Sequence, residues 1–225
     1  MYAKNKPDTF IVYENNNKYC PKTKDELTDI IKELTDKGIT DLNCIDTSKI
    51  TDMRGLFATE LSEIDNIDIS KWDVSNVTNM QQMFSAYKKF NCDLSNWDVS
   101  NVTDMAAMFT AYENFEGKGL ENWDVSNVED TDYMFYKCEN LNCDLSGWDV
   151  NNVTNMTSMF DGCTNFNCDL SNWNVSNVKN MSYLFNGCKK LNCDLSNWNV
   201  KNVTNMLCLF DSCTSLKNKP SWYKE

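Results

Sequence analysis

The chain of 225 residues contains no histidine, the side chain that most often carries out acid and base catalysis near neutral pH. A phosphate-binding loop is also missing, because the one Gly-x-Gly pair, Gly117 and Gly119, lies where a strand is expected. We therefore expect no enzymatic activity, no catalytic residues and no cofactor. Zinc sites that use histidine are excluded as well, and we expect no metal site.

Basic residues are also scarce. The chain has 21 Lys and Arg against 33 Asp and Glu, which gives a formal net charge of −12. Nucleic acid and anionic membranes are bound through basic surfaces, so both are excluded as partners. No apolar run approaches the roughly 18 residues of a spanning helix, and we expect no membrane insertion. Residues 1–20 also lack an apolar run long enough for a signal peptide.

What the chain does have is a repeat. Tryptophans recur at intervals of 25 or 26 residues, and each opens a close copy of the phrase WDVSNVTNM. A period of about 20 to 50 residues is typical of solenoids and propellers, whose copies bury their apolar faces against one another. A propeller blade needs about 40 to 45 residues, so this period favours a solenoid of about seven turns. The repeated tryptophans are Trp72, Trp97, Trp123, Trp148, Trp173 and Trp198.

Apolar residues hold fixed places in each copy. The spacing Val, +3, +6, +7, +10 predicts one face of a short helix or 3-10 segment. The next stretch alternates apolar and polar residues and predicts a short parallel strand. These strands are expected near residues 92–94, 143–145, 168–170 and 193–195. The Trp, Val, Met and Phe columns should be buried, and the last consists of Phe57, Phe84, Phe109, Phe135, Phe160, Phe185 and Phe210.

The phrases ITDMRGLF, DISKWDVSNVTNM and NCDLSNWDVSNVTDM, with the lead-in PKTKDELTDIIKEL, resemble the BspA-like leucine-rich-repeat surface proteins. The resemblance runs from Pro21 to Phe210. It implies a leucine-rich-repeat-like solenoid of the α/β class, and in bacteria an exported protein involved in adhesion. Similar proteins occur in protists and large DNA viruses, and no catalytic residue is implied. The expected fold thus combines short parallel strands and short helical or 3-10 segments with an N-terminal helical cap.

The start of the chain departs from the period and is predicted to be a cap. Residues 23–38 predict an amphipathic helix, because Thr23 and Glu26 form a capping box and an apolar stripe ends at a glycine. Residues 10–13 and 19–20 flank a polar turn and predict a hairpin.

The other end also departs from the period. Pro220 ends regular pairing, and Trp222 with Tyr223 is expected to close the last turn. The chain is thereby divided into an N-terminal cap at 1–41, a solenoid at 42–215 and a C-terminal cap at 216–225.

Eleven cysteines alternate with Tyr, Phe or Leu at inward positions, which is typical of buried small apolar side chains. Stacked copies about 4.8 Å apart are close enough for disulfides, and several bridged pairs would indicate an oxidising compartment. Parallel side-chain directions and the odd total favour free thiols instead. The two main columns are Cys138, Cys163, Cys188, Cys213 and Cys92, Cys143, Cys168, Cys193.

Polar residues form columns too. An Asn column from Asn76 to Asn202 and an Asp column from Asp73 to Asp149 are expected to satisfy backbone groups at turns, and calcium binding by the Asp column is the alternative. A further Asp column is predicted to point outward. The third copy breaks the pattern with an extra residue in EGKGL. The break reflects either drift of one repeat or a contact with a partner, and the extra residue predicts a bulge in the strand. The candidate interaction surface comprises Asp68, Asp93, Asp144, Asp169, Asp194, Glu116 and Lys118.

Two classes of function fit this sequence. The first is a non-enzymatic repeat scaffold that mediates protein–protein interaction or adhesion, with a protein or a glycan as partner. The second is a structural component of a larger assembly such as a viral capsid, as a minor capsid or cement-like protein. The lack of a signal peptide favours a cytoplasmic or virion-associated location over the cell surface.

Overall fold

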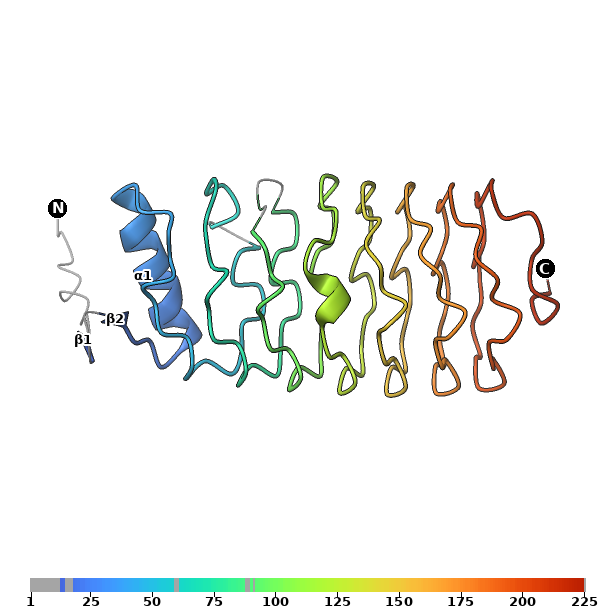
Figure 1. The fold of residues 1–225 in the computed structure, drawn as a ribbon, viewed down its shortest axis with the longest axis horizontal. Helices are drawn as coiled ribbons and strands as arrows, with labels where there is room; N and C mark the ends of the chain where they lie inside the picture. The colour runs from blue at the N-terminus through green and yellow to red at the C-terminus, as the bar shows by residue number, and fades with distance from the viewer. Residues whose placement is uncertain (1–12, 15–17, 59–60, 88–89, 91, 225) are drawn as a thin grey trace, which may run out of the picture.

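The computed structural model describes residues 13–14, 18–58, 61–87, 90 and 92–224. The chain forms a row of coils stacked along one long axis, with helix α1 at the N-terminal end and the C terminus at the other (Figure 1). Each coil takes one sequence repeat and consists of two long runs joined by turns. The solenoid expected from the tryptophan period is therefore confirmed.

Helix α1 (Lys24–Asp36) lies against the first coil. The Thr23 hydroxyl accepts a hydrogen bond from the Glu26 N–H at 3.2 Å, and the Glu26 carboxylate accepts one from the Lys22 N–H at 2.7 Å. The first bond satisfies an N–H group that the first turn of a helix leaves open, and the second ties the residue before the N-cap to that turn. The helix predicted over 23–38 is confirmed, and it spans residues 24–36. Its buried stripe is Leu27, Ile30, Ile31 and Leu34.

A small hairpin precedes α1. Strands β1 (Tyr13–Glu14) and β2 (Lys18–Tyr19) pair antiparallel, with Tyr13 opposite Tyr19. The second strand begins one residue earlier than predicted, and residues 10–12 of the predicted first strand lie outside the described residues.

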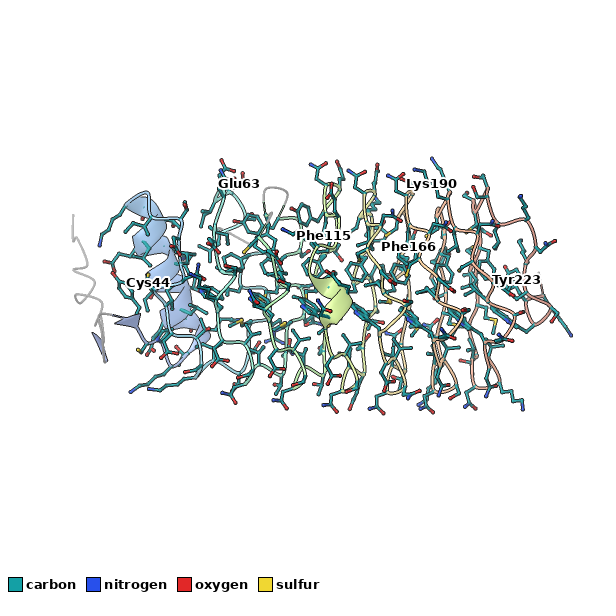
Figure 2. The ribbon with its side chains drawn as sticks, viewed as in Figure 1. Cys44, Glu63, Phe115, Phe166, Lys190 and Tyr223 are labelled. Carbon is teal, nitrogen blue, oxygen red and sulfur yellow. The ribbon has the colours of Figure 1, made fainter. Side chains whose placement is uncertain are left out.

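One apolar core runs through all the coils. Every residue of the phenylalanine column is at most 2% exposed, as predicted. The ring of Phe160 stacks between those of Phe135 and Phe185, with centroids 5.7 and 5.8 Å away. Side chains such as Phe115 and Phe166 fill the space between the two runs of each coil (Figure 2). Because burial of such a side chain contributes about 1.5 to 3 kcal/mol, the stacked columns dominate the stability of the fold.

The tryptophan column adds a buried hydrogen bond to each coil. The Trp148 indole N–H donates to the Leu120 carbonyl of the preceding coil at 2.8 Å, and Trp173 donates to Leu145 at 3.0 Å. Trp222 continues the column, since its indole N–H reaches the Leu195 carbonyl at 2.8 Å and its ring stacks on that of Trp198. The C-terminal segment therefore covers the tryptophan side of the last coil.

The coils pair along a different run from the one predicted. Single-residue parallel bridges connect Asp52 to Asn79 and continue, one per coil, to Asn205. In this ladder the Phe160 N–H donates to the Leu184 carbonyl of the next coil at 3.0 Å. The ladder thus follows the Val-to-Phe run, and the structure assigns no strand to it beyond these bridges among the described residues.

The parallel strands predicted at residues 92–94, 143–145, 168–170 and 193–195 are wrong. No backbone hydrogen bond joins these segments of neighbouring coils in the described part of the chain. A cysteine side chain stands between them instead, as where the Cys168 sulfur accepts the Leu145 N–H at 3.1 Å. A side-chain acceptor placed between two backbones keeps them too far apart for direct pairing.

The short helices or 3-10 segments predicted for the Val-to-Phe run are wrong as well, because this run consists of successive tight turns. The Met159 N–H bonds to the Met156 carbonyl at 3.3 Å, with Ser158 in the left-handed region at φ 51°. A positive φ at the third residue is the mark of a type II turn. Turns that follow one another at intervals of four residues produce the apolar spacing that suggested a helix. A 3-10 helix, η1 (Leu120–Asn122), is found in the third copy.

Candidate functional site

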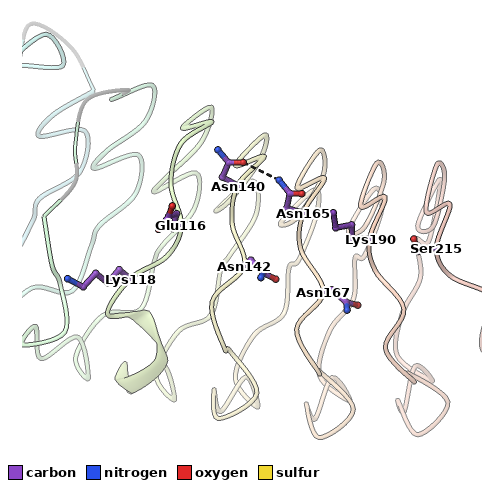
Figure 3. Close-up of a pocket in the computed structure, with 8 residues that line it drawn as sticks. All are labelled: Glu116, Lys118, Asn140, Asn142, Asn165, Asn167, Lys190 and Ser215. Atoms are coloured by element: carbon purple, nitrogen blue, oxygen red, sulfur yellow. Dashed lines mark hydrogen bonds between the residues drawn. The ribbon is translucent and has the colours of Figure 1, made fainter.

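In each coil, a second run leads from the phenylalanine to the next tryptophan, and we call it the return run. A shallow polar groove of about 1070 Å³ crosses the return runs of successive coils. Figure 3 shows the side chains that line it, with Lys118 at one end and Ser215 at the other. Two smaller hollows that include Asp144, Asp169 and Asp194 adjoin it and share Asn142 and Asn167 with it. The lining of the main groove is Glu116, Lys118, Asn140, Asn142, Asn165, Asn167, Lys190 and Ser215.

Asparagine side chains make up half of this lining. Asn142 and Asn167 each precede the inward cysteine of their coil, so their amides face outward and are exposed. The Asn165 amide donates to the Asn140 oxygen of the neighbouring coil at 3.1 Å. Since a primary amide has two donors and an acceptor oxygen, the groove presents both kinds of hydrogen-bonding group in each coil.

Backbone groups beside the groove are also open. The N–H groups of Asp144, Asp169 and Asp194 have no hydrogen-bond partner within the described part of the chain, and all three residues are exposed. Backbone donors need a partner, and here water or a ligand must supply it. These open donors recur once per coil because the cysteine columns keep the return runs apart.

The carboxylates of this Asp column cap turns. Asp144 accepts the Ser146 N–H at 2.9 Å and Asp169 accepts the Ser171 N–H at 3.0 Å. Hydrogen bonds from these serines lower the pKa of Asp144 and Asp169. At neutral pH the column is therefore ionised, and one oxygen of each carboxylate is committed to the turn.

The third copy closes one end of the groove. The Lys118 ammonium lies 3.0 Å from the Asp93 carboxylate. A Cβ on Gly119 would lie 2.5 Å from the Ser95 nitrogen, and one on Gly117 would lie 2.5 Å from the Cys143 sulfur. The extra residue is absorbed as helix η1 rather than as the predicted bulge, because there is no strand here in which to bulge.

The structure gathers part of the predicted surface. Glu116 and Lys118 line the groove, and the three later aspartates border the adjoining hollows. Asp93 contacts the end of the groove through its ion pair with Lys118. Asp68 lies one coil earlier, and its carboxylate accepts the Ser70 N–H at 3.0 Å. The groove asparagines were missed, although the repeated Asn-Cys-Asp phrase signals them. The residues not predicted are Asn140, Asn142, Asn165, Asn167, Lys190 and Ser215.

The other polar columns act at turns, as predicted. The Asn152 amide donates to the Ser126 carbonyl of the preceding coil at 2.7 Å, and Asn202 donates to Ser176 at the same distance. In the neighbouring Asp column, Asp149 accepts the Asn151 N–H at 3.0 Å. These side chains are committed to the fold and contribute little to a binding surface.

The cysteines are free thiols, as expected from their columns. The Cys163 and Cys188 thiols donate to the carbonyls of Phe135 and Phe160 at 3.0 Å. Burial raises the pKa of both thiols, and it raises that of Cys168 to about 11. Protonated, buried sulfur is unreactive, so these columns pack the core and link the coils.

Within the described residues, no group of His, Cys, Asp or Glu side chains is arranged to hold a metal ion. None of the helices in this part of the chain is long and apolar enough to cross a membrane.

Comparison with known proteins places this repeat in a family. A family model described as "Mycoplasma protein of unknown function, DUF285" matches residues 25–119 and again residues 104–223. No curated protein matches the chain.

Two solved structures are weakly similar. A leucine-rich repeat protein from Eubacterium ventriosum is 18% identical with a TM-score of 0.41, over 67% of this chain and 44% of that one. The TLR13–ssRNA13 complex is 11% identical with a TM-score of 0.22, over 86% of this chain and 37% of that one. The chain therefore spans less than half the length of either solved protein. Because the two family matches together run from residue 25 to residue 223, the chain belongs to the DUF285 family of Mycoplasma proteins of unknown function.

Proposed function

We propose that the chain is a non-enzymatic repeat scaffold that binds a macromolecular partner along the groove. One observation carries this proposal: successive coils offer open amide side chains and open backbone N–H groups on the same face. On the ladder run, by contrast, backbone donors such as the Phe160 N–H are already paired with the next coil. A partner on the groove face would find donors that the fold leaves open, among them the Asn142 and Asn167 amide N–H groups and the backbone N–H groups of Asp144 and Asp169.

The repetition of the groove supports an extended partner. A single hydrogen bond contributes only about 0.5 to 1.5 kcal/mol, so one coil binds weakly. Several coils that offer the same groups add their contributions when one molecule spans them. The resemblance to BspA-like surface proteins supports a binding role, and adhesion is the form of it that we propose.

A pair of arginine substitutions tests this function. Asn142→Arg with Asn167→Arg would fill the groove, and Thr154→Arg with Thr204→Arg would place the same charges on the exposed threonines of the ladder run as a control. Each variant and the wild type are immobilised and incubated with an extract of the cells in which the protein naturally occurs. The amount of each captured partner is then compared between variant and wild type. A partner lost by the groove variant and kept by the control is expected, whereas equal capture by both variants would contradict the proposal.

Charge reversal at the end of the groove is a second test. Glu116→Lys with Lys118→Glu is expected to weaken association with that partner. The melting temperature should hardly change, because an exposed ion pair such as Lys118–Asp93 contributes at most about 1 kcal/mol. Unchanged association would remove this end of the groove from the binding surface.

A further inference from the structure

The middle of the groove repeats its chemistry in two neighbouring coils, those of Asn142 and Asn167. Rings of Phe109, Phe135 and Phe160, which mark successive coils, have centroids 5.7 Å apart. Asn142 and Asn167 offer the same amide in neighbouring coils, and each is followed two residues later by an open backbone N–H. A ligand that lies along the groove meets the same groups in these two coils, one interval apart. The site therefore favours a polymer whose own unit has a similar length.

An extended peptide does not have that unit. Its side chains alternate between two faces, so groups on one face recur about every 6.6 Å and gradually fall out of step with the coils. Protein interfaces also depend on aromatic and aliphatic anchors, and the side chains that line the groove are amides, charged groups and a hydroxyl. In a linear polysaccharide, by contrast, each sugar ring advances the chain by about the distance between neighbouring coils. Each ring also presents hydroxyl groups.

The charge of the groove face decides what kind of sugar polymer fits. Ionised Asp144, Asp169 and Asp194 border the adjoining hollows, and the whole chain carries a formal charge of −12. Lys118 and Lys190 line the groove, but Lys118 is paired with Asp93, so the net field still repels polyanions. Hydroxyl groups both donate and accept, so they match the carboxylate oxygens, the amides and the open N–H groups together.

We infer that the groove binds an uncharged linear polysaccharide, with its sugar rings in step with the coils. This inference rests on the proposed function and names the chemistry of the partner. The chain of sugars would run along the solenoid axis from Lys118 toward Ser215 and accept hydrogen bonds from Asn142 and Asn167 (Figure 3).

Affinity electrophoresis of the full chain tests the inference. The protein migrates through native gels that contain a neutral glucan, mannan or xylan, or the anionic polygalacturonate or heparin. Retardation by at least one neutral polymer and by neither polyanion is expected. Asn142→Ala with Asn167→Ala should raise the apparent Kd roughly tenfold, the effect of losing about 1.4 kcal/mol of hydrogen bonding.

Two controls keep the test specific. Asn151→Ala removes an exposed amide from a turn of the same coil as Asn142→Ala and should leave the apparent Kd unchanged. Because Asn167 also accepts the Asn192 N–H at 2.8 Å, the single variant Asn142→Ala is measured too, and thermal melting shows that each variant is folded.

The possible results separate this inference from the proposed function. No retardation by neutral polymers, retardation by polyanions alone, or equal retardation of groove variants and wild type would overturn the polysaccharide. If the groove variants at the same time lose a protein partner, a binding scaffold remains and only its ligand changes. If they lose no partner of any kind, the proposed function fails as well.

Discussion

Lys137→Gly should give a more stable protein than Lys137→Ala, although it removes one more carbon atom. Lys137 lies at the third place of a type II turn with φ 59°, in the left-handed region. The equivalent residues of the next two coils are Gly162 and Gly187, at φ 79° and 75°. The chain thus contains both versions of the same turn, one with a side chain and one without.

The magnitude follows from the backbone. A left-handed conformation costs an L-residue roughly 1 to 2 kcal/mol, and glycine avoids this cost. Glycine in turn loses about 0.5 to 1 kcal/mol through the greater freedom of its unfolded chain. Lys137 also lies over the Tyr136 ring at 5.1 Å, an exposed contact that contributes about 0.5 kcal/mol. Lys137→Ala loses that contact and keeps the strained backbone, so Lys137→Gly should exceed Lys137→Ala by about 0.5 to 1 kcal/mol.

Urea unfolding followed by tryptophan fluorescence measures the difference. Thermal melting gives a second readout, because an advantage of 1 kcal/mol over Lys137→Ala corresponds to a melting temperature about 2 to 4 °C higher for a chain of this size. Gly162→Ala should lose a similar amount or more, because its Cβ would lie 3.2 Å from the Lys137 Cγ. At Thr154, whose φ is not positive, glycine should be less stable than alanine. The turn assignment is refuted if glycine is no better than alanine at Lys137.

Two further perturbations test the core and the ladder. Phe160→Ala should cost about 3 to 5 kcal/mol, measured by urea unfolding, because it opens a cavity between stacked rings, and a loss below 1 kcal/mol would overturn the register. Burial, with repulsion from Asp130, raises the pKa of Asp132 to about 6. The folded state then binds its proton more tightly than the unfolded chain, so the unfolding free energy should fall as pH rises from about 4 to 6. Asp130→Asn should reduce that fall and stabilise the protein at pH 7 by about 1 kcal/mol, since Asn155 fills the same place in the next coil; an unchanged pH profile would refute the repulsion.

The fold could be predicted from the sequence as far as its columns reach. The 25-residue period identified the solenoid, and buried columns such as that of Phe160 fixed the register of every coil. The ladder could not be predicted, because successive type II turns place apolar residues three and four apart, as a helix does. The cysteine column misled in the same way. It alternates like a strand, yet its sulfur atoms hold the return runs apart.

The interaction surface stays a prediction, although some of its residues lie at the groove. Aspartates of the outward column border the hollows beside the groove, but each also caps a turn, so their regular spacing reflects the fold at least as much as binding. The groove asparagines escaped notice because asparagine is also the residue of the turns. Asn152 donates to a neighbouring coil, whereas the side chain of Asn142 faces the groove. Sequence spacing shows that both belong to columns and does not show which column faces an open surface.

The break in the third copy is more informative than any regular column. Drift of one repeat would leave its neighbours unaltered, yet Gly117 and Gly119 lie where a Cβ would come within 2.5 Å of the coils on either side. The extra residue is therefore fitted to both neighbours. It also brings Lys118 to the end of the groove, next to Asp93. The groove thus has a paired cation, Lys118, at this end, and a second cation, Lys190, lies further along it.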